Sequence, residues 1–115
     1  MSNNTVSLQG WLTLRRDHVR EARVNGTVSL VVDADMTTGK PYLGERHAVV
    51  LEGRQAEMAL ALLEAYRAET LTVQANVRGT LRTFWERGKP CAAVAVRYVE
   101  FLGEPRKRES AHAEA

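Results

Sequence analysis

The residues best suited to binding chemistry are two arginines and a phenylalanine at evenly spaced positions. Arg78, Arg82 and Phe84 are separated by multiples of two residues, and Thr80 continues the same polar side. Because every second side chain of a strand points to one face, these residues are expected to share a surface. Guanidinium groups along a strand can contact successive phosphates, and a neighbouring ring can stack on an unpaired base. The pattern indicates either a surface for single-stranded nucleic acid or an ordinary solvated strand face.

Other basic and aromatic residues extend this candidate surface. Trp85 has the phase opposite to Phe84 and is expected in the core, unless a bulge near the hairpin turns it outward. Beyond it, Arg87, Gly88 and Lys89 are expected to form a turn. The full set of candidate DNA-binding residues is Arg78, Arg82, Phe84, Trp85, Arg87, Lys89, Lys40, Tyr42, Arg46 and Arg54.

Two further basic groups are weaker candidates. The first lies near the first predicted hairpin and consists of Arg15, Arg16, Arg20 and Arg23. Exposed arginines usually serve solubility, so we leave this group out of the candidate site. The second consists of Arg106, Lys107 and Arg108. It is able to touch phosphate, but a short terminal stretch of mixed charge favours a solvated tail.

The sequence gives little support for catalysis or for metal binding. The three histidines lie in dissimilar segments, and with the single Cys91 they do not reach the spacing of a zinc site. Asp33 and Asp35 share a strand face, but no histidine, lysine or second acidic cluster is set against them, so we expect them to keep a loop or edge soluble. Glycine-rich phosphate loops and nucleophile elbows are also absent from the sequence. We expect a protein that is not an enzyme and that takes no cofactor and no metal.

The composition predicts one small intracellular domain. A chain of 115 residues with 44% hydrophobic residues can form one compact domain but not two of ordinary size. Its formal net charge of +2 permits nucleic-acid binding without requiring it. The unpaired Cys91 lies in an alanine and valine run that predicts a buried strand, and it indicates a reducing cytosol. No segment has the length that crosses a bilayer and the N-terminus resembles no leader, so we expect a soluble, cytoplasmic protein associated with the nucleoid.

Alternation and chain-breaking residues predict the order strand, strand, strand, helix, strand, strand. Asn25-Gly26 favours a tight hairpin that pairs the first two strands, and glycines with a proline predict a loop over residues 36–44. Residues 54–69 lack glycine and proline and have the composition of a helix. The strands are expected at residues 5–14, 28–34, 46–51, 71–85 and 91–102.

Five strands with one helix between the third and the fourth is the element order of an all-β oligonucleotide-binding barrel, the OB-fold. The sheet face and hairpin loops of this fold bind nucleic acids or sugar chains, although the fold alone does not determine the ligand. We expect the barrel to span residues 1–103 and a charged tail to span residues 104–115.

Several segments carry a family resemblance. In chain order they are NTVSLQGWL, the Asn25-Gly26 hairpin, GERHAVVLEGRQAE, GTLRTFW and FLG. Together they extend from Asn4 to Gly103 and resemble bacterial single-stranded-DNA-binding proteins, a family that includes primosomal relatives. The resemblance implies sequence-tolerant binding of single-stranded DNA in replication, recombination or repair. It also implies a homodimer or homotetramer, with replication or recombination proteins as further partners.

The chain departs from this family where its members carry stacking rings. At those positions the chain has Asp35 or Met36, Arg46 and Glu52. Each stacked base contributes about 1–3 kcal/mol, so the loss of several rings predicts weaker or differently routed binding unless Trp11, Tyr42, Phe84 or Trp85 substitutes. The chain also lacks the acidic, phenylalanine-ended tip with which the family recruits replication and repair enzymes. These departures keep open an alternative function, an assembly or mediator protein that binds other proteins with weak or no DNA affinity.

The first predicted strand is the expected contact between subunits. Opposite its core face it presents a polar and aromatic surface that a two-fold partner can cover, and the resemblance implies strand pairing there. For Trp11, an interface role with partial burial is favoured over base stacking. His47 matches a family histidine that helps to hold subunits together, so a packing or interface role is expected. The candidate interface residues are Thr5, Ser7, Gln9, Trp11 and His47.

Overall fold

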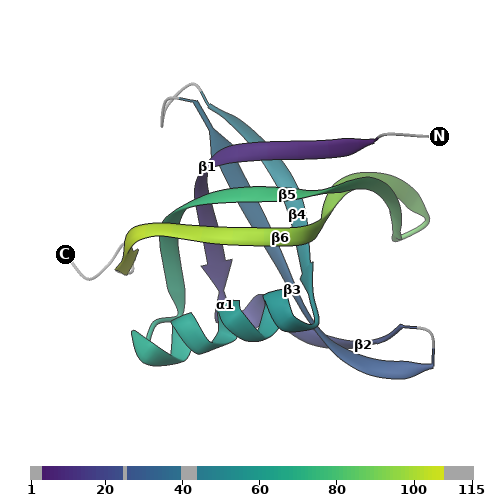
Figure 1. The fold of residues 1–115 in the computed structure, drawn as a ribbon. Helices are drawn as coiled ribbons and strands as arrows, with labels where there is room; N and C mark the ends of the chain where they lie inside the picture. The colour runs from purple at the N-terminus through teal and green to yellow at the C-terminus, as the bar shows by residue number, and fades with distance from the viewer. Residues whose placement is uncertain (1–3, 25, 40–43, 108–115) are drawn as a thin grey trace.

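The described residues form six strands, one α-helix and one short 3-10 helix (Figure 1). The computed structural model describes residues 4–24, 26–39 and 44–107. The elements in chain order are β1 (Thr5–Arg15), η1 (Arg16–His18), β2 (Val19–Val24), β3 (Thr27–Thr38), β4 (Glu45–Glu52), α1 (Arg54–Ala65), β5 (Thr70–Glu86) and β6 (Lys89–Lys107). Within these described ranges, no helix is long and apolar enough to cross a membrane.

The strands form one coiled sheet in the order β1-β5-β6-β4-β3-β2. β1 pairs antiparallel with β5 along its whole length, and near its end it also pairs with β3, where Trp11 lies opposite Thr37. A short parallel contact joins β6 to β4, with Val49 opposite Val94. These pairings return the first strand to the third and close the sheet around a core. The predicted all-β oligonucleotide-binding fold is therefore confirmed.

The closure depends on a close crossing of β1 over β3 at Gly10. A Cβ atom at this position would collide with the backbone carbonyl oxygen of Thr37, which cannot move away without disturbing the strand. Glycine is therefore required here by the approach of two backbones.

Aliphatic side chains fill the inside of the sheet. The largest fully buried ones include Leu12, Leu14, Met36, Leu51 and Leu71. α1 covers one end of the barrel, below the sheet in Figure 1, and contributes Ala56, Ala59 and Leu63 to the same core. Burying a large aliphatic side chain contributes about 1.5–3 kcal/mol relative to leaving it in water, so this interior stabilises the fold.

The strand order differs from the prediction at the first hairpin. The short helix η1 turns the chain after β1, so that a separate strand, β2, precedes the hairpin. Val24 at the end of β2 lies opposite Thr27 of β3, and Gly26 between them has a φ of 80°. Asn25 lies outside the described residues. The predicted hairpin thus joins β2 to β3, whereas β1 pairs mainly with β5.

The segment predicted as a loop over residues 36–44 begins later than expected. β3 continues through Thr38, and Met36 is fully buried in the core. The strand ends before Gly39, which has a φ of 83° that side-chain-bearing residues rarely adopt. The first glycine, rather than the polar residues before it, ends the strand.

The helix is shorter than the predicted residues 54–69. α1 ends at Ala65, because Arg67 has a φ of 50° and the chain turns there. The backbone N–H of Ala68 then donates to the carbonyl oxygen of Leu63 over 3.0 Å, which satisfies the helix end and buries Ala68 in the core.

The last strand extends beyond Gly103, where we expected the domain to end. β6 continues to Lys107, and Arg106 lies opposite Thr72 of β5 after an irregularity in the pairing. Gly103 has a φ of 70° within this irregular stretch. Arg106 and Lys107 therefore belong to the sheet. Residues 108–115, with Arg108 and His112, lie outside the described residues.

Candidate nucleic-acid interface

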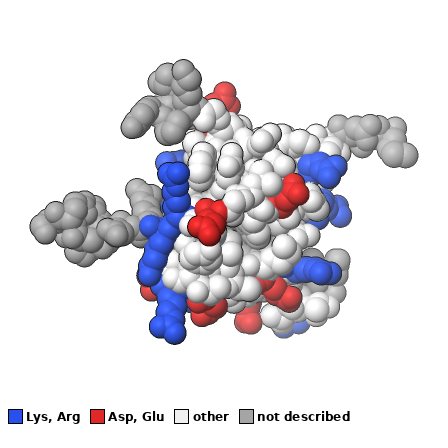
Figure 2. All heavy atoms as spheres, turned by 60° about the vertical axis from the view of Figure 1, so that its left-hand side comes forward, with Lys and Arg blue, Asp and Glu red and all other residues white. Residues whose placement is uncertain are grey.

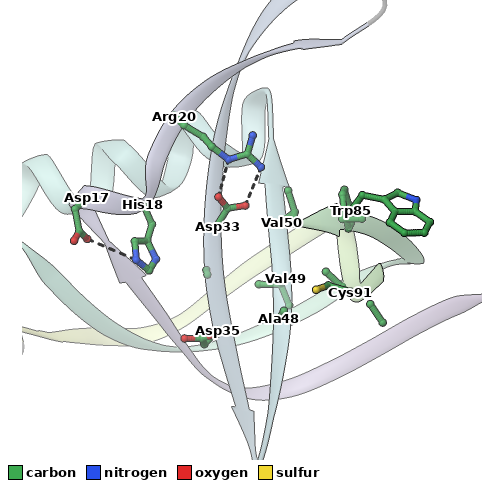
Figure 3. A pocket seen from close by; sticks show the side chains of 14 residues that line it. Asp17, His18, Arg20, Asp33, Asp35, Ala48, Val49, Val50, Trp85 and Cys91 are labelled. Atoms are coloured by element: carbon green, nitrogen blue, oxygen red, sulfur yellow. Dashed lines mark hydrogen bonds and ion pairs between the residues drawn. The ribbon is translucent and has the colours of Figure 1, made fainter. Parts of the chain in front are cut away.

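A groove of about 640 Å³ crosses the outer face of the sheet between η1 and the β5–β6 hairpin (Figure 3). Ala48 and Val50 of β4 lie along its middle, together with Ala93 of β6. The side formed by η1, β2 and β3 is charged and carries Asp17, His18, Arg20, Asp33 and Asp35. The hairpin side carries Phe84, Trp85 and Cys91. The groove is therefore apolar along its middle, charged on one side and aromatic on the other.

The apolar part of the groove is a second, smaller hydrophobic cluster outside the barrel. Val31, Val50 and Ala93 are buried in it, and Phe84 packs against them while remaining partly exposed. Val50 follows the inward-facing Val49 directly, so the two side chains lie on opposite faces of β4 although both are buried. The outer face of the sheet is therefore partly covered by its own hairpin, and Phe84 is one of the residues that cover it.

Trp85 is exposed, which corrects the prediction that it lies in the core. Its side chain has an exposed fraction of 73% and stands at the hairpin side of the groove (Figure 3). Gly79 is buried, but Leu81, which has the same phase, is already 48% exposed. The alternation predicted the correct strand face, but β5 leaves the barrel after Gly79, so this face no longer meets the core.

Cys91 is also exposed, whereas the sequence predicted a buried position. It lies opposite Phe84 on the same projecting hairpin. The alanine and valine run that suggested burial does become buried, but only from Ala93 onward.

The predicted face of Arg78, Arg82 and Phe84 exists on β5, but its residues have different surroundings. The guanidinium of Arg78 lies 5.1 Å from the centre of the Tyr98 ring, a cation–π contact on the outer side of the barrel. Arg82 is exposed and lies opposite Ala93, so its side chain leaves the strand on the groove side of the hairpin. The face therefore runs from the outer wall of the barrel at Arg78 to the groove at Phe84.

The remaining basic candidates are spread over several elements. Arg87 and Lys89 are exposed at the tip of the β5–β6 hairpin, Arg46 is exposed on β4, and Arg54 is exposed at the start of α1. In the part of the chain that the structure describes, none of these four side chains forms an ion pair. Lys40 and Tyr42 lie outside the described residues. Figure 2 shows basic side chains along both edges of one face of the molecule, and the surface between them is mostly other residues with scattered acidic side chains.

Most of the basic group near the first hairpin is occupied by internal ion pairs. Arg15 Nη1 lies 3.2 Å from Asp35 Oδ2. Arg16 donates to the carboxylate of Glu64 over 3.0 Å and to the carbonyl oxygens of Leu63 and Ala68 at the end of α1. These arginines fasten β1 and η1 to β3 and to the helix end, which supports leaving them out of the predicted site.

Arg20 and Asp33 form the shortest ion pair among the described residues that line the groove. Arg20 Nε and Nη2 donate to the two carboxylate oxygens of Asp33 over 2.7 and 3.0 Å. These hydrogen bonds raise the pKa of Arg20 above its ordinary value, while partial burial acts in the opposite direction and Glu52 adds a smaller increase. This pair was not predicted from the sequence. The register fixed by the Asn25-Gly26 hairpin was the available signal, because it places Arg20 opposite Val31, two residues from Asp33.

The structure also places the positions where the resemblance implies stacking rings. Met36 points into the core, so Asp35 is the residue that faces the groove. Arg46 is exposed, and Glu52 is partly buried near Arg20. Asp35 therefore places a carboxylate in the groove where the resemblance implies a ring. The exposed ring at the groove is Trp85, on the hairpin side. Among the described residues, no group of three or more His, Cys, Asp or Glu side chains is placed to hold a metal ion.

The candidate subunit contact lies mainly on β1. Thr5, Ser7 and Gln9 are exposed, and β1 has no strand on its second edge until Trp11, as far as the described residues show. Trp11 is partly buried, with the guanidinium of Arg106 5.2 Å from the ring centre. His47 lies on β4, separated from β1 by β3, and its Nε2 is 3.3 Å from the hydroxyl oxygen of Thr38. The structure groups the β1 residues and sets His47 apart from them.

Some known proteins are similar to this chain in their fold. No protein-family model and no curated protein matches the sequence. Solved structures do match. The dimeric N-terminal domain of PriB protein from Thermoanaerobacter tencongensis has a TM-score of 0.58 at 16% identity, over 90% of this chain and 100% of that chain. The chain has the fold of single-stranded-DNA-binding proteins.

Two further structures support the same assignment. Rim1, a mitochondrial single-stranded DNA binding protein from S. cerevisiae, matches with a TM-score of 0.53 at 12% identity, over 96% of this chain and 100% of that chain. The small single-stranded DNA-binding protein from Streptomyces coelicolor matches with a TM-score of 0.51 at 10% identity, over 88% of this chain and 96% of that chain. The predicted resemblance is confirmed in the fold.

Proposed function

We propose that the protein binds single-stranded DNA with little sequence preference, and that the strand lies in the groove along the β5–β6 hairpin. The observation that carries this proposal is Trp85, a large ring that is 73% exposed beside an apolar groove. Exposing an indole to water is unfavourable, and every nucleobase offers a flat face that can cover it. Trp85 is thus the best placed ring for stacking in the described structure.

Charge favours the hairpin side of the groove for the phosphates. Arg82, Arg87 and Lys89 are exposed there. On the opposite side, Asp33 and Asp35 face the groove and each is paired with an arginine, so that side offers little net positive charge. A single strand can therefore place its backbone near the hairpin and its bases over the apolar middle. Binding by few rings and few free cations should be weaker than in a groove lined with rings.

The cellular setting of this binding is replication, recombination or repair in the cytoplasm, at the nucleoid. The fold shared with proteins that are named for single-stranded DNA binding supports the role in DNA metabolism, and the location is proposed from the sequence alone. Proteins of replication or recombination are the partners expected with such a role.

A titration of labelled oligo-dT followed by fluorescence anisotropy tests the proposal. We expect saturable binding at about 50 mM salt and a clear loss of affinity at about 200 mM, because phosphate contacts release counterions. A duplex of the same length serves as the comparison. Folded protein that shows no saturable binding even at low salt would refute the proposal.

We also propose that two copies pair through the open edge of β1. The edge from Thr5 to Gly10 has unpaired backbone groups in the described structure, and such an edge can be satisfied by a second strand. The dimeric state of the PriB domain is consistent with this arrangement. Light scattering should give a dimer or a pair of dimers.

Trp11→Ala tests the same interface. Trp11 stands where the open edge meets the barrel, so the substitution should shift the mass towards monomer and leave circular dichroism largely unchanged. A monomeric wild-type protein would contradict this proposal without affecting the DNA titration.

A second candidate function is assembly with other proteins, and Asp35 and Glu52 favour it. Both carboxylates occupy positions where the resemblance implies stacking rings. An affinity capture repeated with nuclease treatment separates the two functions. Partners recovered after nuclease treatment would support assembly, whereas partners recovered only with intact DNA would support the DNA-binding role.

A further inference from the structure

The ion pair between Arg20 and Asp33 occupies a position where a phosphate is able to bind. Arg20 extends from β2 to the charged side of the groove, and Asp33 reaches the same place from β3 (Figure 3). The side chains remain 49% and 43% exposed, so both groups are open to the groove. Two parallel hydrogen bonds of 2.7 and 3.0 Å join the Nε–Nη2 edge of the guanidinium to the carboxylate.

This edge of a guanidinium binds a carboxylate and a phosphate with the same geometry. Both ligands present two oxygens to two parallel N–H groups. While Asp33 occupies the edge, Arg20 offers a nearby phosphate little net charge. An ion pair at this degree of exposure is weakly held, because both groups are still solvated. A phosphate that reaches this side of the groove can therefore compete for the same donors.

We propose that Arg20 is a phosphate-binding residue of the groove whose Nε–Nη2 edge is blocked by Asp33, and that single-stranded DNA gains this contact only by displacing the carboxylate. We call this blocking ion pair the latch. The inference rests on the proposed DNA binding and adds the regulation of that site. Asp33 then lowers the affinity of the groove for a strand that reaches β2, because the carboxylate must first be displaced from Arg20. Arg15 is not an equivalent case, because it pairs with Asp35 but does not line the groove.

Asp33→Asn removes one negative charge and also frees Arg20, so it needs a control that removes the same charge without freeing an arginine. Asp17→Asn provides this control, because Asp17 lines the same groove and its nearest ionic partner is His18, at 4.0 Å. Both proteins are titrated with labelled oligo-dT over a range of salt concentrations. Circular dichroism and thermal melting confirm that each remains folded.

We expect Asp33→Asn to bind roughly fivefold more tightly than Asp17→Asn, a difference of about 1 kcal/mol. Its plot of log affinity against log salt should be steeper by up to roughly 0.7, the value for one phosphate bound on a single strand, according to how far Asp33 keeps this contact from forming in Asp17→Asn. Equal affinities and equal slopes for the two variants would overturn the latch.

A double-mutant comparison assigns the gain to Arg20. In an Arg20→Ala background, Asp33→Asn should gain no more affinity than Asp17→Asn gains in that background. A full gain without Arg20 would show that Asp33 acts only by repelling phosphate, and it would overturn the inference. If wild type binds and the two aspartate variants do not differ, the latch alone fails. If no variant binds at any salt concentration, the proposed function fails and the latch fails with it.

Discussion

The two faces of β4 have very different surroundings. Val49 and Leu51 point into the barrel, where they are fully enclosed by other aliphatic side chains. Ala48 and Val50 point into the groove, where the neighbours are a small apolar cluster, an exposed tryptophan and paired charges. The inner face is uniform and the outer face is mixed, although both are built from the same eight residues, Glu45–Glu52.

This difference separates residues that hold the fold from residues that can vary with function. An inner residue must be apolar and of the right size, because the interior is closely packed. An outer residue must only avoid disturbing the sheet, so it can be a ring, a charge or an alanine. Substitutions on the inner face should therefore change stability, and substitutions around the groove should change binding.

The largest effect is expected from Leu51→Ala. The leucine is fully buried, so the cavity left by its truncation should lower the free energy of unfolding by about 2–5 kcal/mol. Urea unfolding followed by circular dichroism measures this loss. Ala48→Ser, on the groove side of the same strand, is the matched control and should change stability by no more than about 0.5 kcal/mol. Equal losses from the two substitutions would remove the contrast between the faces.

Trp85→Ala should weaken DNA binding and leave stability nearly unchanged. The ring is mostly in solvent, so its loss should leave the unfolding free energy within about 0.5 kcal/mol of wild type. The affinity for oligo-dT should fall by about 1–3 kcal/mol, the contribution of one stacked base. Anisotropy titration and urea unfolding on the same samples measure both quantities. Unchanged affinity would show that the strand does not pass over this ring.

Phe84→Ala sharpens the same comparison, because Phe84 is the neighbouring ring but packs against the cluster of Val31, Val50 and Ala93. Truncating a fully buried aromatic residue costs about 3–5 kcal/mol, so this partly exposed ring should cost less, about 1–3 kcal/mol. Urea unfolding measures the loss. If Phe84→Ala changes binding alone and Trp85→Ala changes stability alone, the roles we assign to the two rings are reversed.

The smallest effect is expected from the arginines of β5. Replacing Arg78 and Arg82 with alanine should flatten the salt dependence of binding by roughly 0.7 for each phosphate that the double variant no longer binds. Arg67→Asn removes one positive charge at the end of the helix, where asparagine tolerates the φ of 50°, and serves as the control. A change in slope no larger than twice that of the control, which removes one charge where the double variant removes two, would indicate an ordinary solvated strand face.

The period of the strands predicted the fold but not where the barrel ends. Alternation identified the inward faces of β1, β4 and β5, and the positions of glycine and proline separated the strands. It could not predict that β5 leaves the barrel after Gly79, because the length of a hairpin beyond a core depends on contacts with distant strands. The predictions for Trp85 and Cys91 were wrong for this reason.

The charged side of the groove was harder to predict from the sequence than the strands were. Asp33 and Asp35 were recognised as sharing a face, but their partners Arg20 and Arg15 lie on other strands. Only the register across the hairpin brings Arg20 near Asp33, and the turn at η1 that sets β2 in place has no strong sequence signal. Of the positions that the resemblance indicated, Asp35 lines the groove, whereas Arg46 and Glu52 are not among its lining residues and Met36 is buried in the core.

The intrinsic fluorescence of Trp85 during DNA binding shows whether the bound strand stacks on this ring. The chain has two tryptophans, so a Trp11→Phe variant leaves Trp85 as the single reporter. Titration with unlabelled oligo-dT should quench its emission to saturation, with the midpoint found by anisotropy, and added salt should reverse the change. Binding by anisotropy with no change in Trp85 emission would place the DNA elsewhere on the protein and contradict the account.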